Sequence, residues 1–410
     1  ENILLTQKNI LLCLDVNPEI EHLKNFFCGK VFTTVDEFNN APKLAKTVVY
    51  FCGDADGNVP ELSLENVSHI DVVTTCSTNY TTNDKYNLIN VGEVPLNIYD
   101  IGVMFPRLFN DNTDYHETIR TSHRFQGLTE SNKPGRAFRK GIYLTHVEQK
   151  EDETQFKLLR CSTNLDGPTD NFRDVDNVVL NRVNQNLAHF LQEETPLNHV
   201  LAQVYENQLV QDGEKVKERK AKISEHSDKT KDMPRNGLIA FCSFYKGFAD
   251  GKFYTDELKH IKHSKTHPYD HTYKAVSVLT RLRFRLKKEI TDEKYNKHFD
   301  VTLYPNSVFV IPLSTNRIYT HEIMPSELPI ENIPTRMGYV ARCSNTNAVF
   351  KDEQTYIVKC GKLIPLEKQT TEGVKELKNK YFAENTTIKQ VEYDGIYFSL
   401  NEGDYTKPLC

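Results

Sequence analysis

The feature that most constrains the fold is a block of short strand-like runs between residues 197 and 350, with few helical stretches between them. Each run is rich in β-branched and aromatic residues, and turn residues bound it. Many short strands separated by turns predict an antiparallel barrel or jelly roll. The runs are Val200–Tyr205, Lys222–Glu225, Gly237–Tyr245, Ala275–Leu286, Asp300–Leu303, Ser307–Pro312, Arg317–Thr320 and Arg336–Arg342.

Residues 1–110 follow a different pattern, in which apolar runs alternate with polar, partly helical stretches. The runs are Asn9–Val16, Thr47–Cys52 and Ile70–Thr75. Strands that alternate with short helices predict an α/β domain with a parallel sheet. A nucleotide site needs a glycine-rich turn after the first strand, and the turn that follows Leu14 has no glycine. The sequence therefore favours a structural or docking role, and which role stays open.

The segments that flank the strand-rich block mix strands and helices. Gly141–Val147 and Gln155–Cys161 are strand-like and joined by a polar hairpin loop, and Asp174–Gln192 has the apolar stripe of an amphipathic helix. The end of the chain predicts a strand, a helix near Thr371–Glu384 and a terminal pair of strands.

Two polar stretches inside the block, Gln211–Ala221 and Tyr254–Tyr273, are interpreted as inserted loops. The resulting prediction is an α+β chain of three parts. They are an α/β domain (residues 1–110), a jelly-roll domain with an N-terminal lid region (111–350) and a short α+β extension (351–410).

Composition narrows the class of protein. Apolar residues make up 38% and charged residues 26%, as in ordinary soluble proteins. The net charge of −5 gives no global nucleic-acid footprint, so any such contact must come from a local patch. No apolar run is long enough to span a membrane. Nine scattered cysteines without a Cys-x-x-Cys predict reduced thiols in a cytoplasmic or nuclear protein and argue against structural zinc.

The first candidate for chemistry is the motif His-x-Asp, which occurs at His69–Asp71, His226–Asp228 and His298–Asp300. Two histidines and one carboxylate on one face of an iron ion leave three positions open for a co-substrate and dioxygen. The first copy begins an apolar strand and is interpreted as part of the sheet. The third copy lies too close to His321 for several strands to intervene. The middle copy, at the edge of the block, is the preferred pair.

The second candidate lies in the strands that follow. Ser307–Ile323 reads as a strand, a turn at Ser314–Asn316 and a second strand that contains His321. Arg336 and Arg342 come next, and because they are six positions apart, both side chains point to one face of a continuous strand. A guanidinium group makes bidentate bonds to carboxylates, so this pair suits a dicarboxylate ligand.

These motifs, in this order, resemble the AlkB-like family of iron(II)- and 2-oxoglutarate-dependent oxygenases. The family also carries an Asn-x-Tyr pair on the strand before His-x-Asp, and here Gln203 and Tyr205 occupy that place, with glutamine instead of asparagine. The resemblance covers about Leu197 to Arg342. It implies a double-stranded β-helix fold, with iron held by His226, Asp228 and His321.

The resemblance also implies roles for the other motif residues. Arg336 would pair with the distal carboxylate of 2-oxoglutarate with help from Tyr205, while Arg342 and Gln203 would lie nearer the iron-chelated end. The reaction would convert 2-oxoglutarate and dioxygen to succinate and carbon dioxide and hydroxylate a C–H bond. An N-methyl group treated in this way leaves as formaldehyde.

A basic stripe offers a possible contact for nucleic acid. Arg281, Arg283 and Arg285 alternate with apolar residues, so on a strand they share one face. That face could track a phosphate backbone, or could be solvated or paired with acidic protein surface. The histidine cluster between His260 and His271 has no supporting carboxylate or cysteine pattern and is interpreted as a solvated loop.

Three classes of function follow from the sequence. The leading one is oxidation or demethylation of a nucleobase in DNA or RNA, which requires aromatic residues that stack on the extruded base. The candidates for stacking are Phe125, Phe138, Tyr143 and Phe172, each of which could equally be core. The alternatives are a protein side-chain hydroxylase or demethylase with the same cofactors, and a non-catalytic β-rich binding module. The sequence leaves the oligomeric state open.

Overall fold

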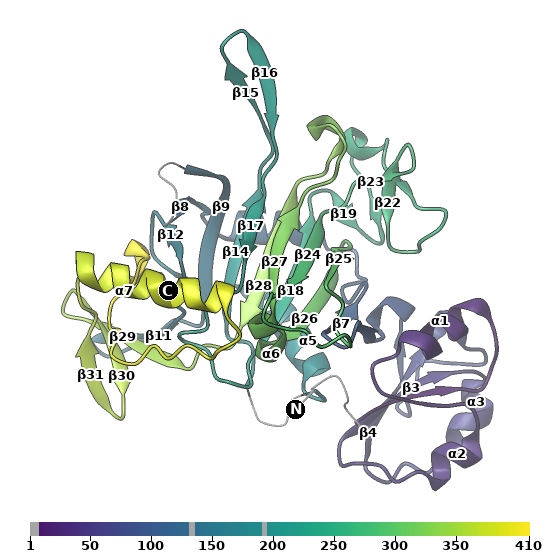
Figure 1. Ribbon diagram of the computed structural model, residues 1–410. Coiled ribbons are helices and arrows are strands. Elements are labelled where there is room, and N and C mark those ends of the chain that lie inside the picture. Colours follow the sequence, from purple (N-terminus) through teal and green to yellow (C-terminus); the bar gives the residue numbers. More distant parts are fainter. Residues whose placement is uncertain (1–7, 131–135, 191–194) are drawn as a thin grey trace. The chain divides into compact units, whose positions relative to one another are not determined.

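The computed structural model describes residues 8–130, 136–190 and 195–410 (Figure 1). The chain divides into two compact units. The first comprises residues 1–110, 182–194 and 307–310, and the second comprises residues 111–181, 195–306 and 311–410. In the described ranges, no helix is long and apolar enough to cross a membrane.

The first unit is built on a parallel sheet in the order β2-β1-β3-β4-β5. Its long central strands are β1 (Asn9–Cys13), β3 (Thr47–Cys52) and β4 (Val67–Val73), as the alternating pattern predicts. The edge strands are β2 (Lys30–Phe32) and β5 (Asn87–Ile89). The helices between the strands are α1 (Pro18–Phe26), α2 (Val35–Asn40) and α3 (Ala55–Asn58). Leu12, Phe38 and Phe51 are fully buried between these layers.

The second unit contains a large sheet that is antiparallel along β8-β9-β14-β28-β18. Strands β14 (His199–Tyr205) and β18 (Leu238–Tyr245) flank β28 (Arg336–Arg342) and are buried along their whole length. Both faces of these strands are therefore covered, which explains their nearly continuous apolar sequence. The outer strands are β8 (Gln126–Glu130) and β9 (Arg136–Thr145).

A second antiparallel sheet has the order β17-β27-β24-β25. It consists of β17 (Ile223–His226), β27 (Tyr319–Met324), β24 (Arg281–Leu286) and β25 (His298–Thr302). The predicted turn before β27 is instead a short helix, α6 (Leu313–Ile318). This helix holds Asn316 beside the loop that follows β17, because the amide of Asn316 bonds to the backbone of Asp228.

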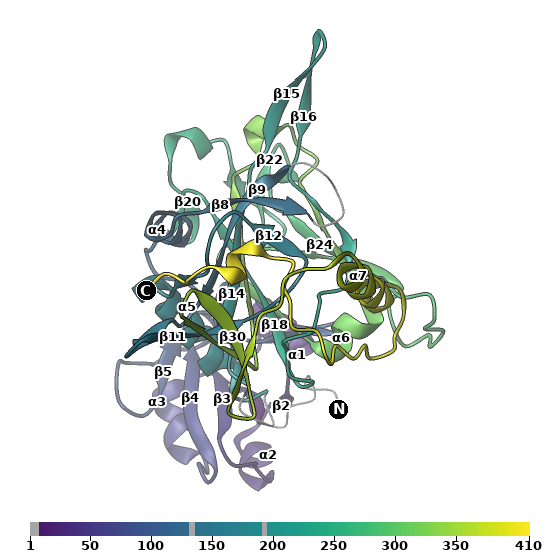
Figure 2. The same ribbon diagram turned by 90° about the vertical axis from the view of Figure 1, so that its left-hand side faces the viewer.

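The second unit also contains a smaller antiparallel sheet and a C-terminal helix. The sheet contains β10 (Glu148–Lys150), β11 (Glu153–Leu158), β29 (Thr346–Lys351), β30 (Gln354–Lys359) and β31 (Lys362–Pro365). Helix α7 (Thr371–Thr386) follows and is drawn in yellow in Figures 1 and 2. The predicted terminal pair of strands is wrong: beyond α7 the chain has only a short 3-10 turn, Glu402–Tyr405.

The stretch Gln211–Ala221 was expected to be a loop, and that prediction is wrong. It belongs to a hairpin of β15 (Gln208–Asp212) and β16 (Lys215–Arg219), which projects outward in both views of the chain (Figures 1 and 2). Gly213 adopts a left-handed φ of 63°, as a tight hairpin turn requires. The charged side chains hid the strand signal because both faces of this ribbon are exposed.

Helices and many antiparallel strands thus share the chain, as the α+β prediction requires. The jelly-roll connectivity and the boundaries at residues 110 and 350 stay predictions.

Candidate metal centre

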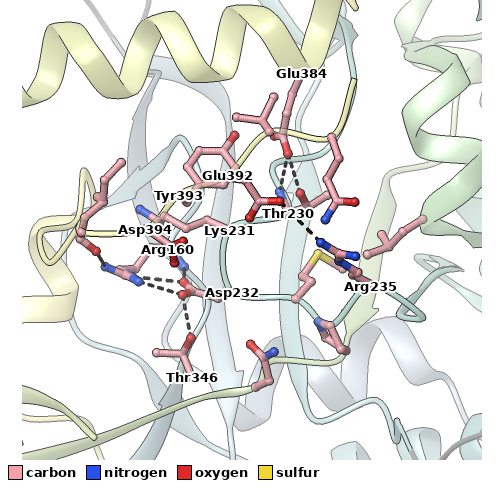
Figure 3. A pocket seen from close by; sticks show the side chains of 18 of the residues that line it. Arg160, Thr230, Lys231, Asp232, Arg235, Thr346, Glu384, Glu392, Tyr393 and Asp394 are labelled. Atoms are coloured by element: carbon pink, nitrogen blue, oxygen red, sulfur yellow. Dashed lines mark hydrogen bonds and ion pairs between the residues drawn. The ribbon is translucent and has the colours of Figure 1, made fainter. Parts of the chain in front are cut away.

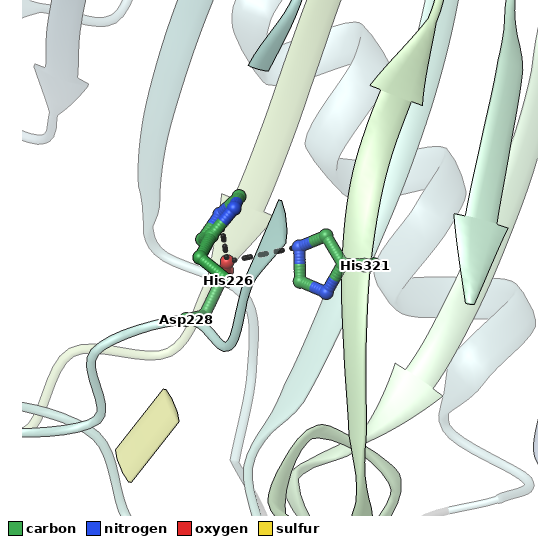
Figure 4. Close-up of side chains that lie close together, drawn as sticks. All are labelled: His226, Asp228 and His321. Carbon is green, nitrogen blue, oxygen red and sulfur yellow. Dashed lines mark ion pairs between the residues drawn. The ribbon is translucent and has the colours of Figure 1, made fainter. Parts of the chain in front are cut away.

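Three side chains of the second unit converge on one point (Figure 4). His226 ends β17, Asp228 lies two residues further on, and His321 lies opposite His226 on β27. The Nε2 atoms of His226 and His321 are 3.4 Å and 3.2 Å from Oδ1 of Asp228. No other group of this kind occurs in the described ranges, and neither His69–Asp71 nor His298–Asp300 joins one.

The orientation of the two rings leaves Nε2 free to act as a ligand. Nδ1 of His226 lies 2.8 Å from the carbonyl oxygen of Ser224, so the ring donates its proton there and its Nε2 keeps a lone pair. His321 is 3% exposed on its side chain and packs against Phe241 and Phe284. Burial, and then repulsion from His226, lower the pKa of His321, which favours the neutral imidazole that a metal ion needs.

Asp228 is held as a carboxylate. Burial alone would raise its pKa, but Arg342 and the two histidines outweigh burial and hold the pKa well below its usual range. Arg342 donates to Oδ2 from Nε at 3.0 Å and from Nη2 at 2.6 Å, so Oδ1 alone faces the two imidazoles. Asn316 fixes the backbone by accepting from the N–H of Asp228 at 2.8 Å and donating to its carbonyl at 3.0 Å. The three ligand atoms lie within 4.8 Å of one another and can hold a divalent metal ion.

The cavity beside these residues has a volume of about 370 Å³ and lies between the two antiparallel sheets of the second unit. Arg336 and Arg342 both line it, which agrees with the same-face placement that their spacing predicts. The Arg336 guanidinium lies over the ring of Tyr205, 4.4 Å from its centroid. Arg336 is 4% exposed, and its Nε and Nη2 have no hydrogen-bond partner among the described residues.

Gln203 and Gly338 complete this end of the cavity. Oε1 of Gln203 is also buried without a partner among the described residues. A Cβ atom on Gly338 would lie 3.1 Å from both Nη1 of Arg336 and Cε2 of Tyr205. The missing side chain at Gly338 therefore leaves room for the stacked pair, and the unpaired donors of Arg336 remain available to an anionic ligand.

Helix α7 contributes side chains to the cavity that the sequence analysis missed. They are Lys378, Tyr381, Phe382 and Asn385. Phe382 is 68% exposed, although it lines the cavity. The sequence predicted a helix at α7 correctly, but a helix prediction does not tell which cavity the helix will border. Phe125, Phe138, Tyr143 and Phe172 do not line this cavity in the part of the chain that the structure describes.

The C-terminal end of α7 is tied to the loop that follows the ligands. Asn385 accepts a hydrogen bond from the N–H of Ser227, and Thr230 donates to Glu384. Lys287 donates to the carbonyl oxygens of Glu384 and Thr387, in the last turn and just beyond it, and Lys229 donates to that of Tyr381 in the turn before. Cations at this end also complement the helix dipole. The helix is thus fixed beside the candidate metal centre by charge-assisted bonds.

The basic stripe on β24 has carboxylate partners. Arg281 and Arg283 contact Asp300 at 3.3 Å and 2.7 Å, and Arg285 contacts Glu322 at 3.2 Å. Glu225 and Glu327 lie further off, at 3.6 Å and 3.9 Å from the stripe. This pairing matches the open alternative in which acidic protein surface faces the stripe. A nucleic-acid contact at these arginines stays a prediction.

The expectation that the histidine cluster lies in a solvated loop is wrong in part, because His263 and His271 face each other across the paired strands β21 (Lys262–His263) and β22 (His271–Tyr273), and His271 is buried. His263 lies 4.3 Å from His271 between ring centroids, His267 stacks on Tyr304 at 4.9 Å, and His260 lies 5.2 Å from Tyr273.

Comparison with known proteins gives no family assignment. No protein-family profile and no curated protein match the chain. Among solved structures, OsALKBH1 is similar at 12% identity and a TM-score of 0.31, over 59% of this chain and 97% of that chain. The Fe(II)/α-ketoglutarate-dependent dioxygenase TqaL is similar at 9% identity and a TM-score of 0.25, over 62% of this chain and 80% of that chain.

Proposed function

We propose that the chain is an iron(II)- and 2-oxoglutarate-dependent oxygenase with a double-stranded β-helix core. One observation supports this above all others. A two-histidine, one-carboxylate group and a buried arginine with unpaired donors, Arg336, line the same cavity. Iron bound by His226, Asp228 and His321 would keep positions for a co-substrate and dioxygen. The partly unpaired guanidinium of Arg336 supplies a positive charge and hydrogen-bond donors for the free carboxylate of 2-oxoglutarate.

Each residue has a proposed role. Arg336 binds the distal carboxylate, and Tyr205 holds the guanidinium plane by stacking. Gln203 hydrogen-bonds the co-substrate closer to the ligands. Arg342 bonds Asp228 directly, so we assign it to orienting that ligand, in place of a contact with the co-substrate. Bound iron would supply the coupling of 2-oxoglutarate decarboxylation to hydroxylation of a C–H bond in the substrate.

For the substrate we propose a nucleobase in DNA or RNA. The exposed ring of Phe382 at the cavity can stack on a flat base. Lys378, one turn earlier on α7, can form an ion pair with the phosphate of the same nucleotide. A protein side chain is the second candidate, because the acid-paired stripe at Arg281, Arg283 and Arg285 and the net charge of −5 weaken the case for a polyanion. A non-catalytic binding module is the third.

Turnover of the co-substrate tests the oxygenase class. Wild-type protein should form succinate from 2-oxoglutarate only when iron(II) and oxygen are present, and N-oxalylglycine should inhibit it. The comparison variant is Arg336→Gln, which should leave metal binding intact and strongly reduce succinate formation at 2-oxoglutarate concentrations that saturate the wild type. If no succinate forms under any condition, including with candidate substrates present, the binding-module alternative replaces the proposal.

The substrate class needs a separate experiment. N-methylated oligonucleotides and N-methylated peptides should be compared by formaldehyde release. We expect release from the oligonucleotide, and we expect Phe382→Ala to raise the Michaelis constant about tenfold, since a base–aromatic stack is worth about 1–3 kcal/mol. Phe26→Ala, which also removes an exposed ring, is the matched control. Release from the peptide alone would move the protein-substrate candidate to first place.

A further inference from the structure

A second cavity of about 470 Å³ lies in the second unit (Figure 3). The loop Thr230–Arg235 forms one side, and the segment Lys389–Tyr397 beyond α7 forms another. It shares no lining residue with the metal cavity among the described residues. Nothing proposed so far uses it.

One buried ion pair of this cavity, Arg160 with Asp232, already has its hydrogen bonds satisfied. Arg160 donates to both carboxylate oxygens of Asp232 and to the carbonyls of Ile396 and Phe398. Thr346 also donates to Asp232 at 2.8 Å. Figure 3 shows these bonds as dashed lines around Asp232. Both oxygens of this carboxylate accept hydrogen bonds from other groups, and Asp232 makes no hydrogen bond to the ammonium group of its neighbour in the chain.

That neighbour is Lys231, whose ammonium nitrogen is buried and has no hydrogen-bond partner among the described residues. Burial and repulsion from Arg160 lower its pKa to about 8, so the group is still mostly charged at neutral pH. A buried cation without a partner costs several kcal/mol, and proteins normally pair such groups. Among the described residues, Lys231 therefore makes no hydrogen bond to an anion, although Asp232 and Asp404 act on its charge electrostatically.

None of the other acids in the described lining makes a hydrogen bond to Lys231. Glu384 accepts hydrogen bonds from the backbone N–H and the hydroxyl group of Thr230. Glu392 pairs with Arg235 at 3.6 Å, and both side chains are largely exposed. Arg317 and Lys389 add two more cations to the lining. The cations that line the cavity are Arg160, Lys231, Arg235, Arg317, Lys359 and Lys389, and the acids are Asp232, Glu384, Glu392 and Asp394.

We propose that this cavity binds a small molecule through an oxyanion, a phosphate or a carboxylate, with Lys231 as its central ligand and Arg317 and Lys389 beside it. The volume falls within the range of small-molecule sites. The inference does not depend on the proposed oxygenase activity.

The site also has a direct connection to the candidate metal centre. Lys231 is three residues beyond Asp228 in the same loop. Asn316, which clamps the backbone of Asp228, lines the second cavity. An anion that draws Lys231 into a new position would therefore act on the segment that carries a metal ligand.

The test uses the full metal-free chain and two probes, inorganic phosphate and succinate, in calorimetric titrations and thermal unfolding. We expect at least one probe to bind and to raise the unfolding temperature. Lys231→Met should weaken the binding of that probe at least about tenfold, since a hydrogen bond to a charged group is worth about 1.5–3 kcal/mol. Lys389→Gln should weaken it roughly threefold, and Lys362→Gln, an exposed lysine outside the cavity, should not change it.

The stability of the variant without any probe separates binding from a structural role. Lys231→Met removes a buried unpaired charge, so it should unfold at the same or a higher temperature than wild type. The proposal is overturned if neither probe binds, or if Lys231→Met and Lys389→Gln bind the probes as wild type does. The probe whose binding depends on Lys231 identifies the oxyanion that this cavity takes. Succinate bound at Arg336 in the metal cavity would bind equally well to Lys231→Met and to wild type.

Discussion

Two side-chain clusters of the second unit are made from the same residue types in opposite proportions. In one, His123 lies between two carboxylates, with Nδ1 2.7 Å from Asp170 and Nε2 2.6 Å from Asp176. In the other, one carboxylate, Asp228, lies between His226 and His321. The first cluster is closed, since both ring nitrogens have partners. The second is open, since two Nε2 atoms and one oxygen face a common point.

The difference determines what each cluster can bind. Burial alone would lower the pKa of His123, but the two carboxylates outweigh it and raise the pKa to about 9. His123 therefore keeps a proton at neutral pH and acts as an internal cation. The pKa of His321 is shifted the other way, which frees its nitrogen for a metal ion. The same side chains thus give a structural ion cluster or a metal site, depending on their ratio and on which atoms stay free.

The largest expected effect comes from breaking the open cluster. His321→Ala removes one of three metal ligands, so iron-dependent succinate formation should fall to the level without enzyme. His123→Asn removes a histidine of equal burial from the closed cluster and should keep succinate formation wherever the protein remains folded. Full activity in His321→Ala, measured by succinate release, would place the metal elsewhere.

The next effect concerns the co-substrate. Loss of a buried charged partner typically costs about 3–5 kcal/mol. Arg336→Ala should therefore raise the Michaelis constant for 2-oxoglutarate by more than about a hundredfold, since about 1.4 kcal/mol is a factor of ten. Arg336→Lys should restore little of the affinity for 2-oxoglutarate, because an ammonium group cannot make the two parallel hydrogen bonds of a guanidinium group. An unchanged constant in both variants would move the co-substrate site away from Arg336.

These residues show how far the sequence could lead. The strand pattern placed Arg336 and Arg342 on one face, because alternation along a strand is a local property. The order of the motifs singled out His226, although three copies of His-x-Asp were present. The bond between Arg342 and Asp228 could not be predicted, because it joins residues 114 positions apart.

Other features of the site had no local signal at all. Alternation put Arg281, Arg283 and Arg285 on one face but did not show that Asp300 and Glu322 face them. The sequence predicted helix α7 but not that Phe382 borders the metal cavity. In both cases the missing information is the packing of distant segments against each other.

The closed cluster predicts a pH dependence of stability. The folded pKa of His123 is raised to about 9 from 6.5, so its contribution is complete below pH 6.5 and is lost as the pH rises through 9. The loss should approach about 3 kcal/mol, measured as the free energy of unfolding in denaturant titrations. Lys231 and Lys287, with pKa values lowered to about 8, act in the opposite direction. The quantity to measure is therefore the difference between wild type and His123→Asn, which should shrink over this range. A constant difference would contradict a charged His123.

The smallest effect is expected at the surface stripe. Arg281, Arg283 and Arg285 already have carboxylate partners, and exposed pairs are worth about 0–1 kcal/mol each. Replacing all three with glutamine should leave 2-oxoglutarate turnover close to normal. If the stripe does meet phosphate, oligonucleotide binding should weaken and its salt dependence should flatten by up to about three units. No change in the salt dependence would remove the stripe from the nucleic-acid proposal.

The most direct test of the account is the stoichiometry of metal binding. Metal-free wild-type protein, titrated anaerobically with iron(II) and separately with manganese(II), should bind one equivalent of either ion. His321→Ala and Asp228→Ala should bind neither ion at this site, whereas His123→Asn should still bind one equivalent. A wild-type chain that binds no iron(II), or a His321→Ala variant that binds a full equivalent, would contradict the assignment of His226, Asp228 and His321 as the metal ligands.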